Sequence, residues 1–262
     1  MTKPKSEYAI QTVQNALRLL EAFHDDVELG VSELARRMQL HKNNVFRLLA
    51  TLEGSGYIEQ SDSTDRYRLG ARCLELGRSF VRSSPLRERA RPVLEALATG
   101  LGEAAHLGVL HGFDVVHLDG HRDGGQLVAA AMRIGQRLPA HCTALGKVLV
   151  GHAGEDAWRD YDAAVVSRGL PGASTQTITD RDKLFEHLRG VVAAGFALDI
   201  DECECGLRCA AAPVFDGEQR VVAALSVSAP SPRLHEERLH DEVVPALRSA
   251  CERLSEQLGC LG

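Results

Sequence analysis

The spacing of apolar residues between positions 12 and 70 restricts the fold of this chain more than any other feature. Three segments place apolar residues at every third or fourth position, as amphipathic helices do, over about 12–23, 33–38 and 41–53. We expect Ser32 to cap the second helix, and Gly54 or Gly56 to end the third in the left-handed conformation. The short connection "QLH" has the length that holds two helices at a steep angle.

Two strand-like segments follow the third helix. "YIEQ" and "YRLG" alternate polar and apolar residues around the polar turn "SDSTDR", as the two strands of a hairpin do. Helix, helix, tight turn, helix and hairpin is the order of a winged helix-turn-helix. We therefore expect residues 10–70 to form an N-terminal all-α winged helix-turn-helix domain that binds DNA.

The third helix carries side chains suited to reading base pairs. Its polar face lies opposite its leucines and consists of Lys42, Asn43, Asn44 and Arg47. Asn pairs bidentately with adenine and Arg with guanine, whereas basic residues also hold phosphates. The net charge of −6 has the wrong sign for nucleic acid, so a local patch must make the contact. Four basic residues and no acid lie between Arg36 and Arg47, and Arg66 on the hairpin is a further candidate. The alternative is that these residues are the solvated face of a small helical bundle.

Composition limits the class of protein. Apolar residues make up 44% and charged residues 25% of the chain, as in soluble globular proteins. There is no apolar run long enough to span a membrane, and the N-terminus lacks the apolar region of a secretory signal. The seven cysteines are odd in number and unevenly spaced, which favours reduced thiols in the cytoplasm over a disulfide framework.

The remainder of the chain predicts a helical linker and a second domain. Residues 71–102 have a helical pattern that Pro85 interrupts, and they either contact another subunit or pack on the next domain. Residues 103–262 mix helices with hairpin-like strand pairs, which predicts an α+β domain with an antiparallel sheet. Within it we expect a strand over "QLVAAAMRI", a helix capped by Thr179 with Asp182 and closed by Gly195, and a final helix over about 235–258.

The stretch "DIDECECGLRC", residues 199–209, holds three cysteines and four acidic residues. As a zinc site its spacing is not standard, although His106, His117 or His141 could add a ligand in space. As a redox switch it favours Cys209, which lies beside Arg208, over Cys203 and Cys205, whose acidic neighbours raise a thiol pKa. No nucleophile signature supports a catalytic cysteine, and the cysteines are equally compatible with a semi-buried filling role.

From about Ile10 to Leu258 the chain resembles the IclR family of bacterial transcription regulators. The resemblance rests on segments that fall in the family's order and spacing over both domains: "LRLLEAF", "SELARRM", "KNNVFRLLATLEGSGYIE", "DRYRLG", "LPAHCTALGKVL", "GFALDIDECECGLRCAAAPVF" and "VVAALSVSAPSPRL". Asn43 and Asn44 stand where the family often has Ser-Thr, which points to a different base preference.

The resemblance implies a regulator without catalytic residues, metal or cofactor. Its C-terminal domain would be a curved antiparallel sheet, similar to GAF and PAS domains, that binds a small organic acid, usually a 2-oxo acid or an aromatic carboxylate. The pocket residues carried over are Ala144, Leu145, Asp199, Leu207, Cys209, Ser226 and Ser228. A helix N-terminus and two serines on one strand face suit a carboxylate, whereas Asp199 suits one only if it is protonated or binds a hydroxyl group.

Partners follow from the same resemblance. We expect a pseudo-palindromic DNA operator, and self-association as a homodimer or a dimer of dimers through the first helix and the linker. An alternative keeps the DNA-binding half and makes the sensor thiol- or zinc-based, through Cys203, Cys205 and Cys209.

Overall fold

The computed structural model describes residues 9–24, 26–124 and 130–260. Its backbone contacts divide the chain into two compact units, Met1–Ser84 and Pro85–Gly262. The division falls inside the segment 71–102, between the two helices that the sequence pattern separates at Pro85. Of the helices in the described ranges, none is both long enough and apolar enough to cross a lipid bilayer.

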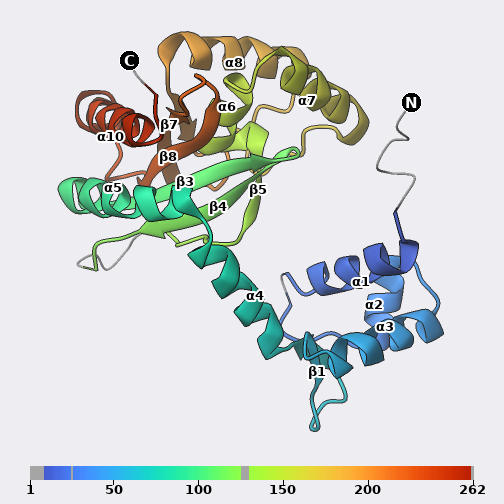
Figure 1. Ribbon diagram of the computed structural model, residues 1–262. Helices are drawn as coiled ribbons and strands as arrows, with labels where there is room; N and C mark the ends of the chain where they lie inside the picture. Colours follow the sequence, from blue (N-terminus) through green and yellow to red (C-terminus); the bar gives the residue numbers. More distant parts are fainter. Residues whose placement is uncertain (1–8, 25, 125–129, 261–262) are drawn as a thin grey trace. The chain divides into compact units, whose positions relative to one another are not determined.

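The N-terminal unit consists of three packed helices, a hairpin and a fourth helix (Figure 1). Its elements are α1 (Gln11–Glu21), α2 (Val31–Met38), α3 (Lys42–Gly54), β1 (Ile58–Gln60), β2 (Tyr67–Leu69) and α4 (Ala71–Arg82). Apolar side chains from α1, α2, α3 and the hairpin bury one another, among them Leu19, Leu34, Leu49 and Ile58. The winged helix-turn-helix is thereby confirmed, with three residues between α2 and α3.

The start of α2 differs from the expectation. Gly30, in an extended conformation, is the N-cap residue, so Ser32 lies inside the first turn and caps nothing. The reason is tertiary: the backbone N–H and C=O of Leu29 each bond to Tyr67 on β2 at 2.9 Å, which fixes the extended entry to the helix. At the end of α3, Gly56 has a φ of 77° and takes the left-handed position that was expected of it or Gly54.

The C-terminal unit combines a sheet with helices. Its elements are α5 (Pro85–Leu101), β3 (Ala104–His111), β4 (Asp114–His121), β5 (Arg137–Pro139), α6 (Ala144–Gly151), α7 (Glu155–Arg168), α8 (Arg181–Ala194), β6 (Ala197–Ile200), β7 (Leu207–Phe215), β8 (Val221–Pro230), α9 (Glu236–Arg238) and α10 (Val244–Gln257). The strand order is β5-β4-β3-β8-β7-β6, and every neighbouring pair is antiparallel. Register shifts in β3 and β7 add local twist, and the predicted curved antiparallel sheet is confirmed.

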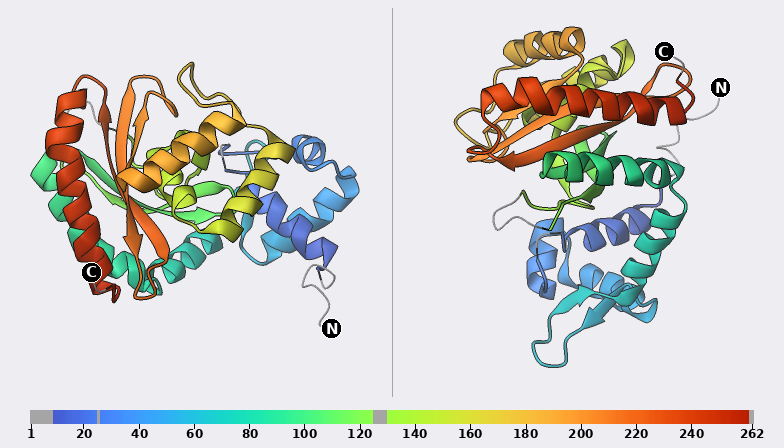
Figure 2. Two further views of the ribbon diagram at one scale, coloured as in Figure 1. Left: turned by 90° about the horizontal axis from the view of Figure 1, so that it is seen from above. Right: turned by 90° about the vertical axis from the view of Figure 1, so that its left-hand side faces the viewer.

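Helices cover both faces of this sheet (Figure 2). α5 and α10 pack on one face, where alternate strand residues such as Leu225 and Val227 join their apolar side chains. α6 and α8 lie over the other face, where Ala211 and Ala224 contact Leu145, Val148 and their neighbours. The side chains of α6 that face the sheet therefore meet the same strand face as the polar residues described below.

The cap of α8 is one residue later than expected. The carboxylate of Asp180 accepts a bond of 2.9 Å from the N–H of Lys183, so Thr179 with Asp182 is not the capping pair. Thr179 and Asp180 could each cap this helix. The burial of Leu184, Leu188 and Val191 fixes which side of the helix faces the core, and this favours Asp180 as the cap. Gly195 ends the helix in the left-handed conformation, as predicted.

The structure shows no strand in the described part of the segment "QLVAAAMRI", where one was expected. Residues 126–129 lie outside the described ranges, and residues 130–134 form no strand. The backbone of His117 on β4 instead bonds to Gly135 and Gln136, and β5 pairs with β4 beyond that point. The N–H of Gln136 bonds to the carbonyl of Arg133 at 2.9 Å and Gly135 has a φ of 81°, so the chain turns here and Arg133 lines the cavity on the sheet face.

The final helix is interrupted. A π-helical turn, Leu239–Val243, separates α9 from α10. Pro245 stands at the start of α10 and has no N–H to donate, so a regular hydrogen-bond ladder cannot pass this point.

Candidate functional site

The polar face of α3 is directed away from the core. Lys42, Asn43, Asn44 and Arg47 are exposed. Val45, Leu48 and Leu49 are buried against the other helices. The four residues named from the sequence are thus available to a partner, and their contact with DNA stays a prediction.

The two remaining basic candidates differ in their surroundings. Arg36 on α2 is exposed. Arg66 is held by α2 and the segment before it, because its Nη2 donates to Glu33 at 3.0 Å and to the carbonyl of Glu28 at 3.0 Å. The carboxylate of Glu33 therefore shares the charge of Arg66, which reduces the attraction of this side chain for a phosphate.

Sequence reasoning passed over Phe46. Its side chain is 56% exposed and stands between Asn43 and Arg47 on the outward face of α3. An apolar side chain at this place suits the methyl group of thymine. The signal was available, since position 46 lies off the apolar stripe of the helix.

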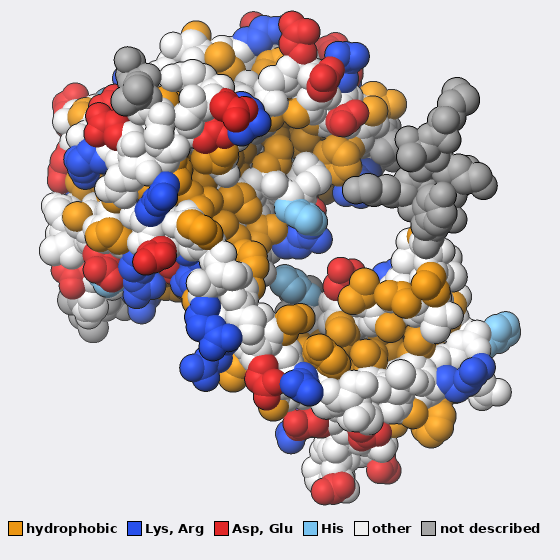
Figure 3. All heavy atoms as spheres, viewed as in Figure 1, with side chains coloured by type: hydrophobic (Ala, Val, Ile, Leu, Met, Phe, Trp, Pro, Cys, Tyr) orange, Lys and Arg blue, Asp and Glu red, His pale blue; other side chains and the backbone are white. Residues whose placement is uncertain are grey.

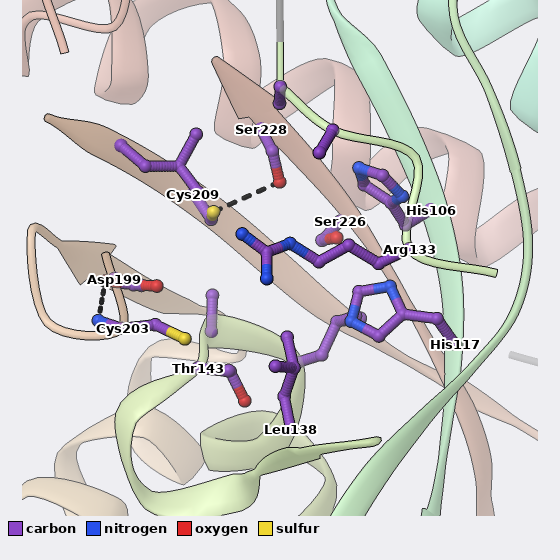
Figure 4. A pocket seen from close by; sticks show the side chains of 15 residues that line it. His106, His117, Arg133, Leu138, Thr143, Asp199, Cys203, Cys209, Ser226 and Ser228 are labelled. Atoms are coloured by element: carbon purple, nitrogen blue, oxygen red, sulfur yellow. Dashed lines mark hydrogen bonds between the residues drawn. The ribbon is translucent and has the colours of Figure 1, made fainter. Parts of the chain in front are cut away.

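The second candidate site is a cavity between the sheet and the N-terminus of α6 (Figure 4). All seven residues named from the sequence line it: Ala144, Leu145, Asp199, Leu207, Cys209, Ser226 and Ser228. They are brought together from α6, β7 and β8 and the end of β6. Whether they bind a ligand stays a prediction.

Strand register explains why these residues meet. Asp199 on β6 pairs with Cys209 on β7, which pairs with Ser228 on β8. The next row on the same face joins Ser226 on β8 to His106 on β3. Residues two apart on a strand share a face, so the two rows form one polar patch beneath α6.

α6 is fixed close to this patch by short contacts at its N-terminus. The hydroxyl of Thr143 accepts a bond of 3.1 Å from the N–H of Gly146 and caps the helix. A Cβ on Gly146 would lie 2.3 Å from the backbone of Ala140, so only glycine permits this approach. Lys147, fully buried, forms an ion pair with the buried carboxylate of Glu202. These contacts join α6 to the loop after β6.

The carboxyl group of Asp199 has a raised pKa. Burial raises its pKa to about 7, although the N–H groups of Glu202 and Cys203 donate to its Oδ1 at 2.8 and 3.3 Å and the charge of Lys147 acts in the same direction as those bonds. The carboxyl is therefore partly neutral near neutral pH. The neutral form of Asp199 repels an anion less than a carboxylate would.

The cysteines do not behave as their sequence neighbours suggest. Burial raises the pKa of Cys209, to which the Ser228 hydroxyl donates at 3.1 Å, so the expectation that Arg208 activates this thiol is wrong. Arg208 points to the opposite side of β7 and bonds to the carbonyl of Leu234. The pKa of Cys203 is lowered, through its hydrogen bond with Cys142, which outweighs its acidic neighbours. All seven cysteines are free thiols, and the described residues contain no cluster of three metal-ligating side chains.

Five polar residues of the cavity were not assigned to it from the sequence: His106, His117, Arg133, Thr143 and Cys203. His106 and His117 were considered only as extra metal ligands, and Arg133 was placed on a strand. His106 and His117 are buried with ring centroids 5.4 Å apart, and burial lowers their pKa values to about 3 and about 4. The side chain of Arg133 extends across the cavity between them and Cys209 (Figure 4). With these side chains in place the free volume is about 30 Å³, the room of one or two water molecules.

Comparisons with known proteins match both units. The family model described as "Bacterial transcriptional regulator IclR C-terminal" matches residues 78–256, and the model "IclR helix-turn-helix domain" matches residues 12–62. The chain is 37% identical to the HTH-type transcriptional regulator XynR of Escherichia coli K12 over 232 residues, which is 88% of this chain and 90% of XynR.

Solved structures agree over nearly the whole length. A putative IclR transcriptional regulator from a Silicibacter species is 30% identical with a TM-score of 0.82, and the match covers 95% of this chain and 97% of that one. An IclR homolog from Microbacterium hydrocarbonoxydans, complexed with 4-hydroxybenzoate, is 27% identical with a TM-score of 0.76, and the match covers 95% and 99% of the two chains.

Proposed function

The chain belongs to the IclR family of bacterial transcriptional regulators, and on that premise we propose that it binds a pseudo-palindromic operator through α3 and senses a small organic acid in the cavity beneath α6. As a family member it is a DNA-binding transcriptional regulator with a C-terminal effector domain, and not an enzyme. We expect the protein to bind its operator in the cytoplasm.

The outward polar face of α3 is the observation that carries the operator half of this proposal. Asn43, Asn44 and Arg47 offer the paired donors and acceptors that distinguish bases in the major groove, and Lys42 with Arg36 offers charge to phosphates. Arg66 would reach the backbone only after leaving Glu33.

The polar patch beneath α6 supports the effector half. A carboxylate at the α6 N-terminus would meet free N–H groups and the positive end of the helix dipole, with Ser226 and Ser228 nearby. The 4-hydroxybenzoate of the Microbacterium relative is an aromatic carboxylate, and a 2-oxo acid has the same anionic group. Effector binding would change operator affinity by a coupling energy of about 1–3 kcal/mol.

Self-association is part of the proposal. Operators of two half-sites are read by two-fold symmetric proteins, so a homodimer or a dimer of dimers is expected. Figure 3 shows apolar side chains gathered on the surface of the N-terminal unit. In the same unit, Val13 and Leu17 on α1 and Leu74 and Phe80 on α4 are exposed. Exposed apolar patches of this kind mark contacts with another protein surface.

The test is capture of sheared genomic DNA on the purified protein, followed by sequencing. We expect enrichment of a pseudo-palindrome upstream of an operon, and a loss of roughly 10- to 100-fold in affinity for it in Arg47→Ala. Arg159→Ala, which removes an exposed arginine of α7, is the matched control and should bind as the wild type does. Absence of any enrichment at low salt, with and without candidate acids, would contradict the proposal.

A further inference from the structure

Arg133 places an incompletely paired cation in the cavity. Its side chain is 19% exposed, and its Nη2 pairs with Glu204, whose own side chain is 55% exposed. Among residues 9–24, 26–124 and 130–260, its Nε and Nη1 have no hydrogen-bond partner. A carboxylate has the geometry to accept two N–H groups of one guanidinium side by side, and such a charged pair is stronger than a neutral hydrogen bond.

The two histidines provide a second, independent observation, because each has a buried ring nitrogen without a hydrogen-bond partner in the described part of the chain. Nδ1 of His106 and both ring nitrogens of His117 are buried without a hydrogen-bond partner among the described residues. Both rings stay neutral at physiological pH, because burial and the charge of Arg133 lower their pKa values. A neutral imidazole has one N–H donor and one acceptor nitrogen.

Hydroxyl groups of a ligand can pair with these buried ring nitrogens. A hydroxyl donates and accepts, so it can pair with either nitrogen of a neutral imidazole, whereas a C–H edge pairs with neither. Ser226, the cross-strand neighbour of His106, adds a further hydroxyl to the same wall. An unsubstituted acid would leave buried ring nitrogens unpaired, which weakens binding.

The remaining wall suits a carbon chain. Ala130, Leu138, Leu145 and Leu207 also line the cavity and give it apolar surface. A ligand that reaches both ends therefore needs an anionic group, an aliphatic chain and hydroxyl groups along it.

We propose that the effector is an aliphatic hydroxy acid whose carboxylate binds Arg133 beside the α6 N-terminus and whose hydroxyl groups bind His106 and His117. Because the cavity has only about 30 Å³ of free volume while the Arg133 side chain lies across it, this side chain must move aside to admit the acid. The inference rests on the proposed function, because it names the ligand class of the same cavity. It also makes Arg133 and the two histidines determinants of specificity that separate hydroxylated acids from simple fatty acids and from polyols.

The test is calorimetric titration of the full-length protein with matched probes. Threonate and gluconate are compared with butanoate and hexanoate, which have the same chain lengths without hydroxyl groups, and with sorbitol, which has hydroxyl groups without the carboxylate. We expect at least one aldonate to bind roughly tenfold or more tightly than its fatty acid and than sorbitol.

Variants test which residues bind the carboxylate of the ligand and which bind its hydroxyl groups. Arg133→Met should weaken aldonate binding by roughly 10- to 100-fold, and Arg133→Lys should restore part of it. His106→Leu and His117→Leu should reduce the preference for the aldonate over the fatty acid. Arg137→Met removes an exposed arginine of β5, outside the cavity lining, and should leave binding unchanged.

The wild-type titrations decide the inference even where a variant fails to fold. Equal binding of both fatty acids and their aldonates, or no aldonate binding at millimolar concentration, would overturn it. If 4-hydroxybenzoate or pyruvate then altered operator affinity, the proposed function would stand and only the ligand class would fail. If no acid altered operator affinity, the proposed function itself would fail.

Discussion

Asp199 shows how strongly a residue's chemistry depends on where the fold places it. Within the sequence it is one of four acids in an exposed-looking run, yet its side chain is only 1% exposed. Burial raises the pKa of its carboxyl to about 7, against the opposing effects of Lys147 and two backbone N–H groups. The buried Glu202 adds to the rise, so the protonation of Asp199 belongs to this cluster of charges.

A stability measurement tests this pKa. In the folded protein the carboxyl keeps its proton up to about pH 7, whereas in the unfolded chain it loses it near pH 4. The favourable contribution of Asp199 is thus complete below about pH 4 and is lost as pH rises to about 7. We expect Asp199→Asn, which stays neutral, to match the wild type near pH 4 and to exceed its free energy of unfolding by roughly 2–4 kcal/mol at pH 8.

Fluorescence of Trp158, the one tryptophan of the chain, reports unfolding of the C-terminal unit in denaturant titrations. Asp201→Asn serves as the matched control, because Asp201 lies two residues after Asp199 in the chain and is partly exposed. A difference between Asp199→Asn and the wild type that does not change with pH would show that folding does not raise the pKa of this carboxyl.

At the scale of elements, α6 determines the shape of the cavity. Its first residues lie against the 3₁₀ turn Ala140–Cys142, and its Gly146 lies in backbone contact with Ala140. The ion pair of Lys147 with Glu202 holds the loop after β6 at the other side of the helix. The segment "AHCTALGK" therefore permits close approach of the helix to the 3₁₀ turn as well as helix formation.

Substitution of Gly146 by alanine tests this contact. The new Cβ would come within 2.3 Å of the Cα and O of Ala140, so the helix must move and the cavity must change shape. We expect a loss of about 1–3 kcal/mol in unfolding free energy of the C-terminal unit, measured by Trp158 fluorescence, with weaker acid binding.

Gly190→Ala in α8 is the matched control for this helix substitution. A Cβ there meets no atom within 4 Å, so alanine should stabilise the helix by about 0.5–1 kcal/mol. If both variants raised stability, the tight packing of α6 on Ala140 would be excluded.

At the scale of the whole molecule, the proposed regulation links two separately folded units. The DNA-reading helix belongs to one unit and the cavity to the other, and the chain passes between them at Ser84 and Pro85. If acid binding changes operator affinity, linkage requires that operator binding change acid affinity by the same factor.

This reciprocity gives a measurement on the intact protein. The dissociation constant of an acid that binds is measured with and without a saturating operator duplex, and the operator constant with and without that acid. We expect both ratios to agree, at roughly 5- to 150-fold. A duplex of scrambled sequence is the control, and an acid affinity indifferent to the operator would show that this acid is not the coupled effector.

Features that depend on neighbours along the chain were predictable from the sequence. The helices and hairpin of the N-terminal unit, the outward placement of Asn43 and Arg47, and the strand pairs of the C-terminal sheet all follow from periodicity and turn residues. The family resemblance then predicted which seven residues share a cavity. That set includes Asp199 and Ser226, which periodicity alone does not connect.

Features that depend on distant contacts required the folded chain. The register across β6, β7, β8 and β3 aligns Asp199 with Cys209 and Ser228, and His106 with Ser226. The turn at Gly135 and Gln136 brings Arg133 into the cavity lining, and burial sets the protonation of Asp199 and the histidines. Amino-acid order specifies local conformation directly, but charge states and ligand geometry arise only when strands far apart in the chain exclude water together.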